Sequence, residues 1–173
     1  MTKQLLYYDF IETPVGIVSA ILYDNYLVRV DFHHYEDENE RTEQWLNKHF
    51  PMREMKKDRQ KLRPYLKQIE EYFAEKRVSF DVPYKSYGTD FQKDVWRALT
   101  TIKYGEIATY KQLAEKINKE KAARAVGGAL NKNPLSIIVP CHRVIGSSGK
   151  MVGFGGGIDV KKKLLLHEQT VIV

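Results

Sequence analysis

This sequence of 173 residues contains a single cysteine, Cys141, and no long hydrophobic run. One cysteine cannot form a disulfide within the chain, so nothing here indicates an oxidising compartment. No apolar stretch approaches the roughly 18 residues that a membrane-spanning helix requires. The beginning of the chain, MTKQLL, also lacks the apolar stretch and the small-residue cleavage site of a secretory signal. We therefore expect a soluble, cytoplasmic protein with no membrane contact.

The chain also has no excess of acidic residues, and its positive charge is unevenly distributed. Residues 1–86 contain 14 Lys+Arg and 15 Asp+Glu, whereas residues 87–173 contain 14 Lys+Arg and 7 Asp+Glu. The net charge of +6 therefore comes entirely from the second part. Cations that neutralise phosphates release counterions, so a nucleic acid is one partner that explains this pattern. A solvated basic surface is the alternative, and charge alone does not separate the two.

The first part has the patterns of a small α/β domain. Strands are predicted where hydrophobic and polar residues alternate, and helices where apolar residues recur every three or four positions. Asp24-Asn25 is a two-residue turn that favours a β-hairpin, and residues 83–88 are interpreted as a linker. We interpret His33 and His34 as surface residues, since no further metal ligands accompany them. The predicted strands are 4–10, 16–23, 26–32 and 78–82, and the predicted helices are 36–49 and 59–76.

The second part is predicted to contain a helix-turn-helix. Thr89 can cap a first helix. Thr109 and Gln112 form a capping-box pattern that opens a short helix, and a further helical stretch follows over 121–130. A short helix, a short turn and a second helix in a basic segment form the outline of many DNA-binding proteins. Many all-helical proteins share that outline, so it indicates DNA binding only weakly.

The segment around Cys141 is the clearest candidate for chemistry. The apolar run 137–139 predicts a short buried strand. Pro140 lacks a backbone donor and should interrupt that strand, which allows Cys141 to present its sulfur to a pocket. The alternative is a cysteine that packs as a small buried hydrophobe.

A nucleophilic cysteine needs a base or a positive charge nearby, because a thiol with a pKa near 8.5 is mostly protonated at neutral pH. His142 follows Cys141, but successive strand residues point to opposite faces, so contact requires irregular backbone or a bridging water. On a C-terminal helix that Asp159 can cap, Glu168 falls on the apolar face and needs a partner. His142 and Arg143 are both candidates, so a catalytic relay and a structural salt bridge stay open.

Two glycine-rich features accompany these residues. Gly127 and Gly128 lie inside the second helix of the pair, where each costs about 1 kcal/mol relative to alanine. Small residues there permit close approach of a DNA backbone or another helix. Residues 153–157, GFGGG, should form a mobile loop centred on Phe154. The lysine and hydroxyl of a phosphate-binding loop are missing from it.

With these residues the chain resembles the O6-alkylguanine-DNA alkyltransferases, also called methylated-DNA–protein-cysteine methyltransferases. The resemblance lies in residues 87–173 and rests on three motifs. PCHRV at 140–144 matches the active-site motif, ARAVGGA at 123–129 matches the recognition helix, and Asn133-Pro134 matches the hinge between helix and strand. The first half matches only in its length and in the order of its strands.

The resemblance implies roles in the chemistry. Cys141 would be the nucleophile, and His142 would take the thiol proton through a water. Glu168 would hold and polarise His142, and Asn133 would stabilise the turn around the site. The backbone carbonyls of Cys141 and Val144 would accept hydrogen bonds from the guanine edge.

The resemblance also implies roles in DNA binding. Tyr110 would donate to the base or crowd the DNA backbone to help flipping, because O6 lies inside the base stack. Arg124 would fill the gap that the flipped nucleotide leaves. Phe154 stands where many relatives have a tyrosine, which puts the reach toward bulky O6 groups in question. The other implied substrate- and DNA-binding residues are Ala123, Gly127 and Gly155.

The fold and the reaction follow from the same resemblance. It predicts an α+β protein with an N-terminal ribonuclease-H-like α/β domain containing a β-hairpin, residues 1–86. A C-terminal helix-turn-helix, winged-helix-like catalytic domain would follow in residues 87–173. The partner would be double-stranded DNA carrying O6-alkylguanine, contacted in the minor groove by a monomer, with activity on O4-alkylthymine left open.

The reaction would leave a thioether that no nearby group can hydrolyse, so each chain would act once and become inactive. No cofactor and no metal are then needed. Some relatives hold zinc in the first domain, but with Cys141 as the only cysteine we expect none here.

Three other functions compete with this interpretation. A DNA-binding regulator would explain the charge and the helix pair but not Cys141, His142 and Glu168. A lesion-binding relative without transfer activity would lack the cysteine. A cysteine hydrolase would need turnover, and nothing in the sequence resembles an oxyanion hole or a peptide cleft.

Overall fold

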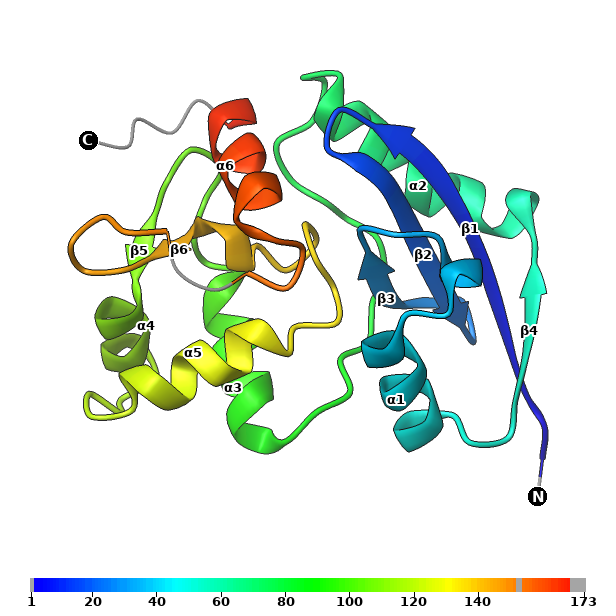
Figure 1. Cartoon of the computed structure of the whole chain (residues 1–173), viewed down its shortest axis with the longest axis horizontal. Helices are drawn as coiled ribbons and strands as arrows, with labels where there is room; N and C mark the ends of the chain where they lie inside the picture. Colours follow the sequence, from blue (N-terminus) through cyan, green and yellow to red (C-terminus); the bar gives the residue numbers. More distant parts are fainter. Residues whose placement is uncertain (1, 152–153, 169–173) are drawn as a thin grey trace. The chain divides into compact units, whose positions relative to one another are not determined.

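The computed structural model describes residues 2–151 and 154–168. The chain divides into two compact units, Met1–Tyr87 and Gly88–Val173, both drawn in Figure 1. A four-stranded sheet with helices forms the first unit, whereas short helices and one two-stranded sheet form the second. The predicted α+β fold class is therefore confirmed.

The sheet of the first unit has the strand order β3-β2-β1-β4. β2 pairs antiparallel with both β1 and β3, and β4 pairs with the other side of β1 in parallel. The elements of this unit are β1 (Gln4–Thr13), β2 (Gly16–Tyr23), β3 (Tyr26–Asp31), the 3-10 turn η1 (Tyr35–Asp37), α1 (Glu40–His49), β4 (Arg53–Lys57) and α2 (Arg59–Phe73).

The predicted β-hairpin between β2 and β3 is confirmed. Asp24 and Asn25 have positive φ angles of 52° and 64°, and Tyr23 pairs with Tyr26 across the turn. Positive φ at both central residues is typical of the type I′ turn, whose twist matches that of antiparallel strands. Asp and Asn tolerate this conformation better than most residues.

Two strand predictions need correction. Residues 78–82 form no strand, because the sheet contact falls on the next segment. There Leu27 N donates to Pro83 O at 2.9 Å and Lys85 N donates to Leu27 O at 3.0 Å, so this segment lies along the edge of β3. β4 was not predicted, because its sequence REMKK is mostly charged and partly exposed at the edge of the sheet.

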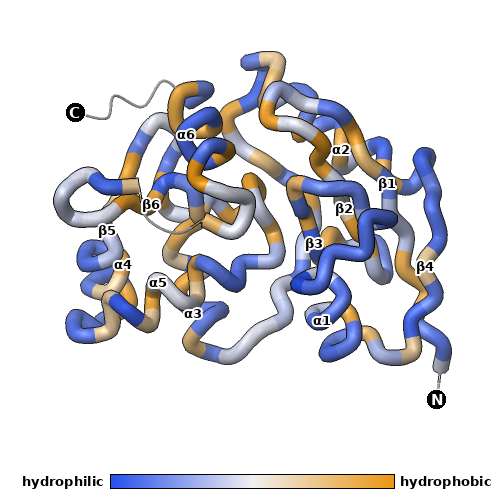
Figure 2. The backbone as a smooth tube through the Cα atoms, in the orientation of Figure 1, coloured by the Kyte–Doolittle hydropathy of each residue, from blue (hydrophilic) through white to orange (hydrophobic). Residues whose placement is uncertain are grey.

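Helices cover both faces of this sheet. On one face, Leu6 of β1 belongs to a hydrophobic cluster with Leu46 of α1. On the other face, Lys61 of α2 lies over the Tyr7 ring, and neighbouring strand residues point to opposite sides. Figure 2 shows hydrophobic and hydrophilic residues mixed along α2. Its buried residues are Leu62, Leu66, Ile69 and Tyr72.

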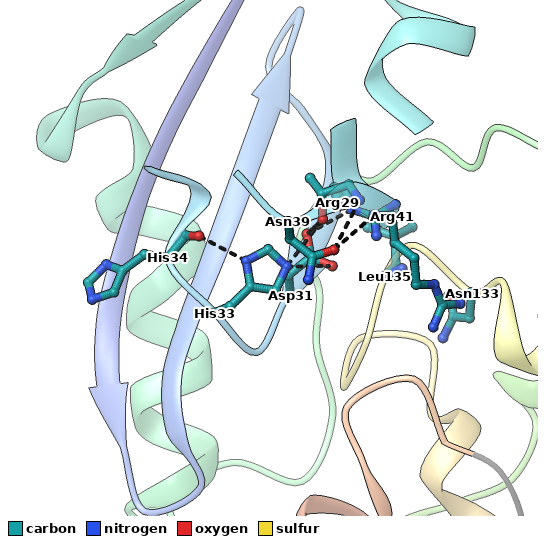
Figure 3. Close-up of polar contacts among 9 residues, drawn as sticks. Arg29, Asp31, His33, His34, Asn39, Arg41, Asn133 and Leu135 are labelled. Atoms are coloured by element: carbon teal, nitrogen blue, oxygen red, sulfur yellow. Dashed lines mark hydrogen bonds and ion pairs between the residues drawn. The ribbon is translucent and has the colours of Figure 1, made fainter. Parts of the chain in front are cut away.

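A polar cluster surrounds His33 (Figure 3). Arg29 Nε donates to Asp31 Oδ2 at 2.7 Å, and Thr42 Oγ1 donates to the same oxygen at 3.3 Å. His33 Nε2 lies 3.2 Å from Thr42 Oγ1, and His33 Nδ1 lies 2.8 Å from the carbonyl oxygen of His34. Among the residues that the structure describes, no group of three His, Cys, Asp or Glu side chains could hold a metal ion.

The second unit is built from short helices that pack on one another. α3 contacts both α4 and α5, and Trp96 Nε1 of α3 donates to the carbonyl oxygen of Ala129 in α5 at 2.9 Å. The elements of this unit are α3 (Asp90–Leu99), β5 (Ala108–Thr109), α4 (Tyr110–Lys116), α5 (Ala123–Asn131), the 3-10 turn η2 (Cys141–Arg143), β6 (Val144–Ile145) and α6 (Ile158–His167).

The predicted helix starts at Thr89 and Thr109 are confirmed. Each threonine side chain accepts a hydrogen bond from the backbone N–H three residues on, where a glutamine completes the capping box. α4 and α5 pack against each other across a short turn and form the predicted helix-turn-helix. No helix within 2–151 or 154–168 is both long and apolar enough to cross a membrane.

Two further predictions for this unit are wrong. Residues 137–139 are buried but form turns in place of a strand, because their hydrogen bonds are local: Val139 N donates to Leu135 O at 2.9 Å. Asp159 does not cap α6. The N-cap is Gly157, with a φ of 95°, and Asp159 lies inside the first turn, where its charge still suits the helix dipole.

Candidate active site around Cys141

An irregular segment between α5 and η2 places Cys141. Asn133 closes this segment, since its Oδ1 accepts from Leu135 N at 3.0 Å and its Nδ2 donates to Val139 O at 2.9 Å. Ile137 has a φ of 71°, in the left-handed region that β-branched residues rarely adopt. The Asn133 side chain thus holds together the strained turn that leads into the cysteine. The predicted hinge at this asparagine leads to a turn and not to a strand.

Cys141 and His142 are the first two residues of η2, and both are buried, with 5% and 0% exposure. The irregular backbone that contact would require is therefore present. Their side chains are nevertheless not hydrogen-bonded, because His142 Nδ1 has no hydrogen-bond partner among the described residues. A bridging water is the remaining route between thiol and imidazole.

Glu168 binds both candidate partners, and the two alternatives are realised together. Its Oε2 lies 2.8 Å from His142 Nε2. The same carboxylate accepts from Arg143 Nε at 2.8 Å and from Arg143 Nη2 at 2.9 Å. Arg143 Nη1 donates in addition to the carbonyl oxygen of Ile102, at 2.6 Å. Glu168 thus joins η2 to the C-terminal end of α6.

These contacts define the tautomer of His142. A carboxylate that accepts from arginine can only accept, so His142 Nε2 carries the hydrogen and donates it to Glu168. Burial lowers the pKa of His142, and the neighbouring Glu168 opposes that shift without reversing it. The imidazole is therefore neutral at neutral pH, and its Nδ1 lone pair is free to accept a proton. The glutamate orients this base more than it charges it.

The Cys141 thiol is under opposing influences. Burial raises its pKa, while the side chain of Asn133, the charge of Lys161 and the backbone N–H groups of η2 lower it. Burial is the largest effect, so the thiol is protonated at neutral pH until a base removes its proton. A base beside it is thus a chemical requirement.

Lys161 is a member of the site that the sequence patterns did not reveal. It lies on α6 and is 1% exposed, which is rare for a lysine. Burial lowers its pKa, and the nearby Cys141 raises it again. A signal was available in the sequence, because Lys161 precedes Glu168 by seven residues, two helical turns along the same face.

The helix pair presents a small-residue face close to the site. On α5, Arg124, Ala125 and Gly128 are exposed. A Cβ added at Gly127 would lie 3.7 Å from the Tyr110 ring of α4, an ordinary van der Waals distance, so Gly127 faces α4 without the packing requiring a glycine. Burial raises the pKa of Tyr110, and so does the proximity of Cys141. Tyr110, the first residue of α4, is therefore close enough to Cys141 for the two side chains to interact electrostatically.

The other residues implied by the resemblance lie in β6, at the start of α5 and in the segment before α6. Val144 pairs with Ala108 in the small sheet, and its N–H donates to the Cys141 carbonyl oxygen. Gly157 N donates to the Phe154 carbonyl at 2.9 Å, while Gly155 is exposed. Ala123 is the half-buried first residue of α5. Of the expected loop 153–157, the first residue lies outside the described residues.

Comparison with known proteins assigns both units to one family. Residues 6–85 match the model of the 6-O-methylguanine DNA methyltransferase, ribonuclease-like domain, and residues 90–170 match that of its DNA binding domain. A methylated-DNA–protein-cysteine methyltransferase of Methanosarcina barkeri is 44% identical over 95% of this chain and 98% of its own.

Solved structures agree. The O6-methylguanine methyltransferase of Mycobacterium tuberculosis superposes with a TM-score of 0.80 at 38% identity, covering 95% of this chain and 93% of its own. A structure of the same organism's OGT in complex with DNA gives a TM-score of 0.80 at 39% identity, covering 94% and 92%.

The chain therefore belongs to the methylated-DNA–protein-cysteine methyltransferase family, and the predicted resemblance is confirmed. It is a methylated-DNA–protein-cysteine S-methyltransferase, a DNA-binding protein of DNA repair.

Proposed function

We propose that this chain repairs duplex DNA by moving the alkyl group of O6-alkylguanine onto Cys141 Sγ in one irreversible step. The new S–C bond forms as the C–O6 bond breaks, and the electron pair of the broken bond stays on O6. The thiol proton passes to His142 and ends, by way of solvent, on the departing guanine. The thioether that remains has no group beside it that could cleave it, so each chain acts once.

The observation that carries this proposal is that Nδ1 of His142 has no hydrogen-bond partner in the part of the chain that the structure describes. The neutral imidazole is fixed by Glu168 through Nε2, and it offers the lone pair of Nδ1 on the residue that directly follows Cys141. A water between the two would take the thiol proton and pass it on, since water-mediated hydrogen bonds are nearly as favourable as direct ones. Asn133 and Lys161 then stabilise the thiolate that forms.

The helix pair would deliver the damaged base from the minor groove. O6 of a stacked guanine cannot reach a buried sulfur, so the nucleotide must leave the stack. α5 exposes Arg124 together with Ala125, Gly128 and Asn131, and the alanine and glycine would allow the helix to approach the DNA backbone closely. Arg124 would occupy the vacated space, and Tyr110 would contact the base as it enters. On this view DNA binding and transfer both belong to residues 87–173.

The test is the mass of the protein after incubation with a duplex that carries one O6-methylguanine. We expect one methyl group per chain, located on the peptide that contains Cys141. Cys141→Ser should gain no methyl group and should bind the duplex as before, because phosphate contacts supply most of the affinity. A methyl group on any other residue, or transfer by the serine variant, would refute the proposal.

A further inference from the structure

The first unit contains a cavity that the transfer reaction does not use. Its volume is about 510 Å³. One wall is four consecutive residues of β1, and the other is a stripe along α2. The lining residues are Asp9, Phe10, Ile11, Glu12, Arg59, Arg63, Leu66 and Glu70.

The β1 wall is an open sheet edge. β4 pairs with β1 only as far as Tyr8, whose carbonyl oxygen accepts a last bond from Asp58 N at 3.1 Å. Alternate residues of a strand direct their peptide groups to the same edge, so Phe10 and Glu12 continue the edge that Tyr8 presents. No described strand pairs with them there. The opposite edge of the sheet is closed, because segment 83–85 lies along β3.

A buried carboxylate lies in the same cavity, and one of its two oxygens has no hydrogen-bond partner among the described residues. The Asp9 side chain is 4% exposed, and its Oδ1 has no hydrogen-bond partner among the described residues. Its Oδ2 has only a loose ion pair with the exposed Arg59, whose Nε lies 3.7 Å away. An unsatisfied buried carboxylate is costly, which favours a donor supplied from outside the unit.

The charges decide between classes of ligand. Asp9 and Glu12 disfavour a phosphate, although two arginines are close. Arg63 is already bound to both carboxylate oxygens of Glu70, at 2.9 and 3.0 Å. No cluster of three acidic, histidine or cysteine side chains among the described residues suits a metal ion. The cation that fits is an ammonium or guanidinium group on a chain that can also pair with the strand edge.

We propose that this cavity is a docking site for an extended polypeptide segment of another protein, one that carries a lysine or arginine. The segment adds a strand to β1 through the peptide groups of Phe10 and Glu12. Its basic side chain pairs with the carboxylate of Asp9, which lines the cavity. Strand addition to an open edge is a common mode of peptide recognition, with backbone bonds giving affinity and side-chain pockets giving specificity.

The probe is the fluorescently labelled pentapeptide acetyl-Val-Lys-Val-Lys-Val-amide, which spans about 16 Å when extended, at 3.3 Å per residue. Fluorescence anisotropy with the full-length protein should show saturable binding. Asp9→Asn should weaken that binding by about tenfold or more, the scale for loss of a buried charge partner. Glu54→Gln is the matched control, because it removes an acidic side chain of the neighbouring β4 that pairs with Lys3 outside the cavity. The Glu54→Gln protein should bind the peptide with the same affinity as the parent protein.

Two further variants test the backbone pairing. Glu12→Pro removes a donor on the open edge, where proline is tolerated, and should weaken binding while the melting temperature stays close to that of the parent. The same peptide, methylated on the backbone nitrogens of both lysines, should bind at least tenfold more weakly to the unaltered protein. This comparison tests the backbone pairing without changing the fold of the protein. The proposal is overturned if the pentapeptide does not bind, or if binding survives both Asp9→Asn and N-methylation.

Discussion

At the scale of single residues, the site depends on which nitrogen of His142 is free. Nε2 donates a hydrogen bond to Glu168, so Nδ1 is left to accept, and burial keeps the ring neutral. A neutral imidazole with a pKa lowered by burial is a weak base in isolation. Fixed orientation beside the thiol compensates, because a held base needs no rearrangement to accept the proton.

Glu168→Gln should damage both reaction and fold. The variant keeps a similar shape but leaves the buried Arg143 charge uncompensated, which costs about 3–5 kcal/mol of unfolding free energy. Loss of a correctly held general base slows reactions by roughly 10²–10⁴-fold. We expect a slower reaction with free O6-benzylguanine, a lower melting temperature, and partial recovery of the rate as pH approaches the pKa of the thiol.

His142→Ala is the matched control for this experiment. It removes the base but keeps the ion pair between Arg143 and Glu168. The rate should therefore fall as in Glu168→Gln, with a smaller loss of melting temperature. A folded Glu168→Gln protein that reacts at the normal rate would show that the glutamate serves only the structure.

Lys161→Met should move the pH dependence of the reaction. The lysine lowers the pKa of the Cys141 thiol, so its removal raises that pKa and reduces the thiolate present at any given pH. The pH at which the rate with free O6-benzylguanine rises should then be higher in this variant than in the parent protein. Methionine fills a similar volume without a charge, and the melting temperature is measured beside the rate to separate loss of the charge from loss of the fold. An unshifted pH–rate profile would remove Lys161 from the site.

At the scale of elements, capping chemistry made the starts of α3 and α4 predictable. Thr89 and Thr109 occupy caps whose partners lie three residues away, so the signal is local and the structure matches it. The strand expected at 137–139 fails for the opposite reason. Its apolar residues are buried, but no strand that the structure describes pairs with them, and the Asn133 side chain holds a turn there. Hydrophobicity alone does not distinguish a buried strand from a buried turn.

The site was predictable where a motif carried it, and less so where it depends on packing. Cys141, His142 and Glu168 stand out from the sequence pattern, whereas the simultaneous binding of Glu168 to His142 and Arg143 depends on how α6 meets η2. Lys161 was not predicted as a site residue, because a lysine on a helix is normally exposed. Only the tertiary structure shows that its side chain is buried beside the thiol.

Arg124→Ala tests the proposed role of α5. Unstacking a base costs a few kcal/mol, and each 1.4 kcal/mol corresponds to a factor of ten. Repair of methylated duplex should therefore slow by about tenfold or more, while the reaction with free O6-benzylguanine stays close to normal. Arg97→Ala removes an exposed arginine of α3, paired with Asp94, and should affect neither reaction. Equal losses on duplex and free base would assign Arg124 to the fold or the chemistry.

At the scale of the whole molecule, the two units differ in what they offer. Residues 88–173 hold the buried thiol, its base and the helix pair, whereas residues 1–87 hold a sheet with one open edge and a cavity beside it. The excess positive charge lies in the part of the chain that holds the thiol. We therefore expect alkyl transfer and polypeptide binding to be separable. Variants of the cavity in the first unit should leave alkyl transfer unaffected, and variants at Cys141 should leave polypeptide binding unaffected.

In the proposed reaction Cys141 accepts one alkyl group and is never regenerated. The decisive measurement is a titration of a fixed amount of protein with duplex carrying O6-methylguanine, in which the methyl groups transferred are counted. Transfer should stop at one methyl group per chain, however much substrate is added and however long the reaction runs. Continued transfer beyond one methyl group per chain would mean that the thioether is cleaved or bypassed, and single use of Cys141 would be refuted.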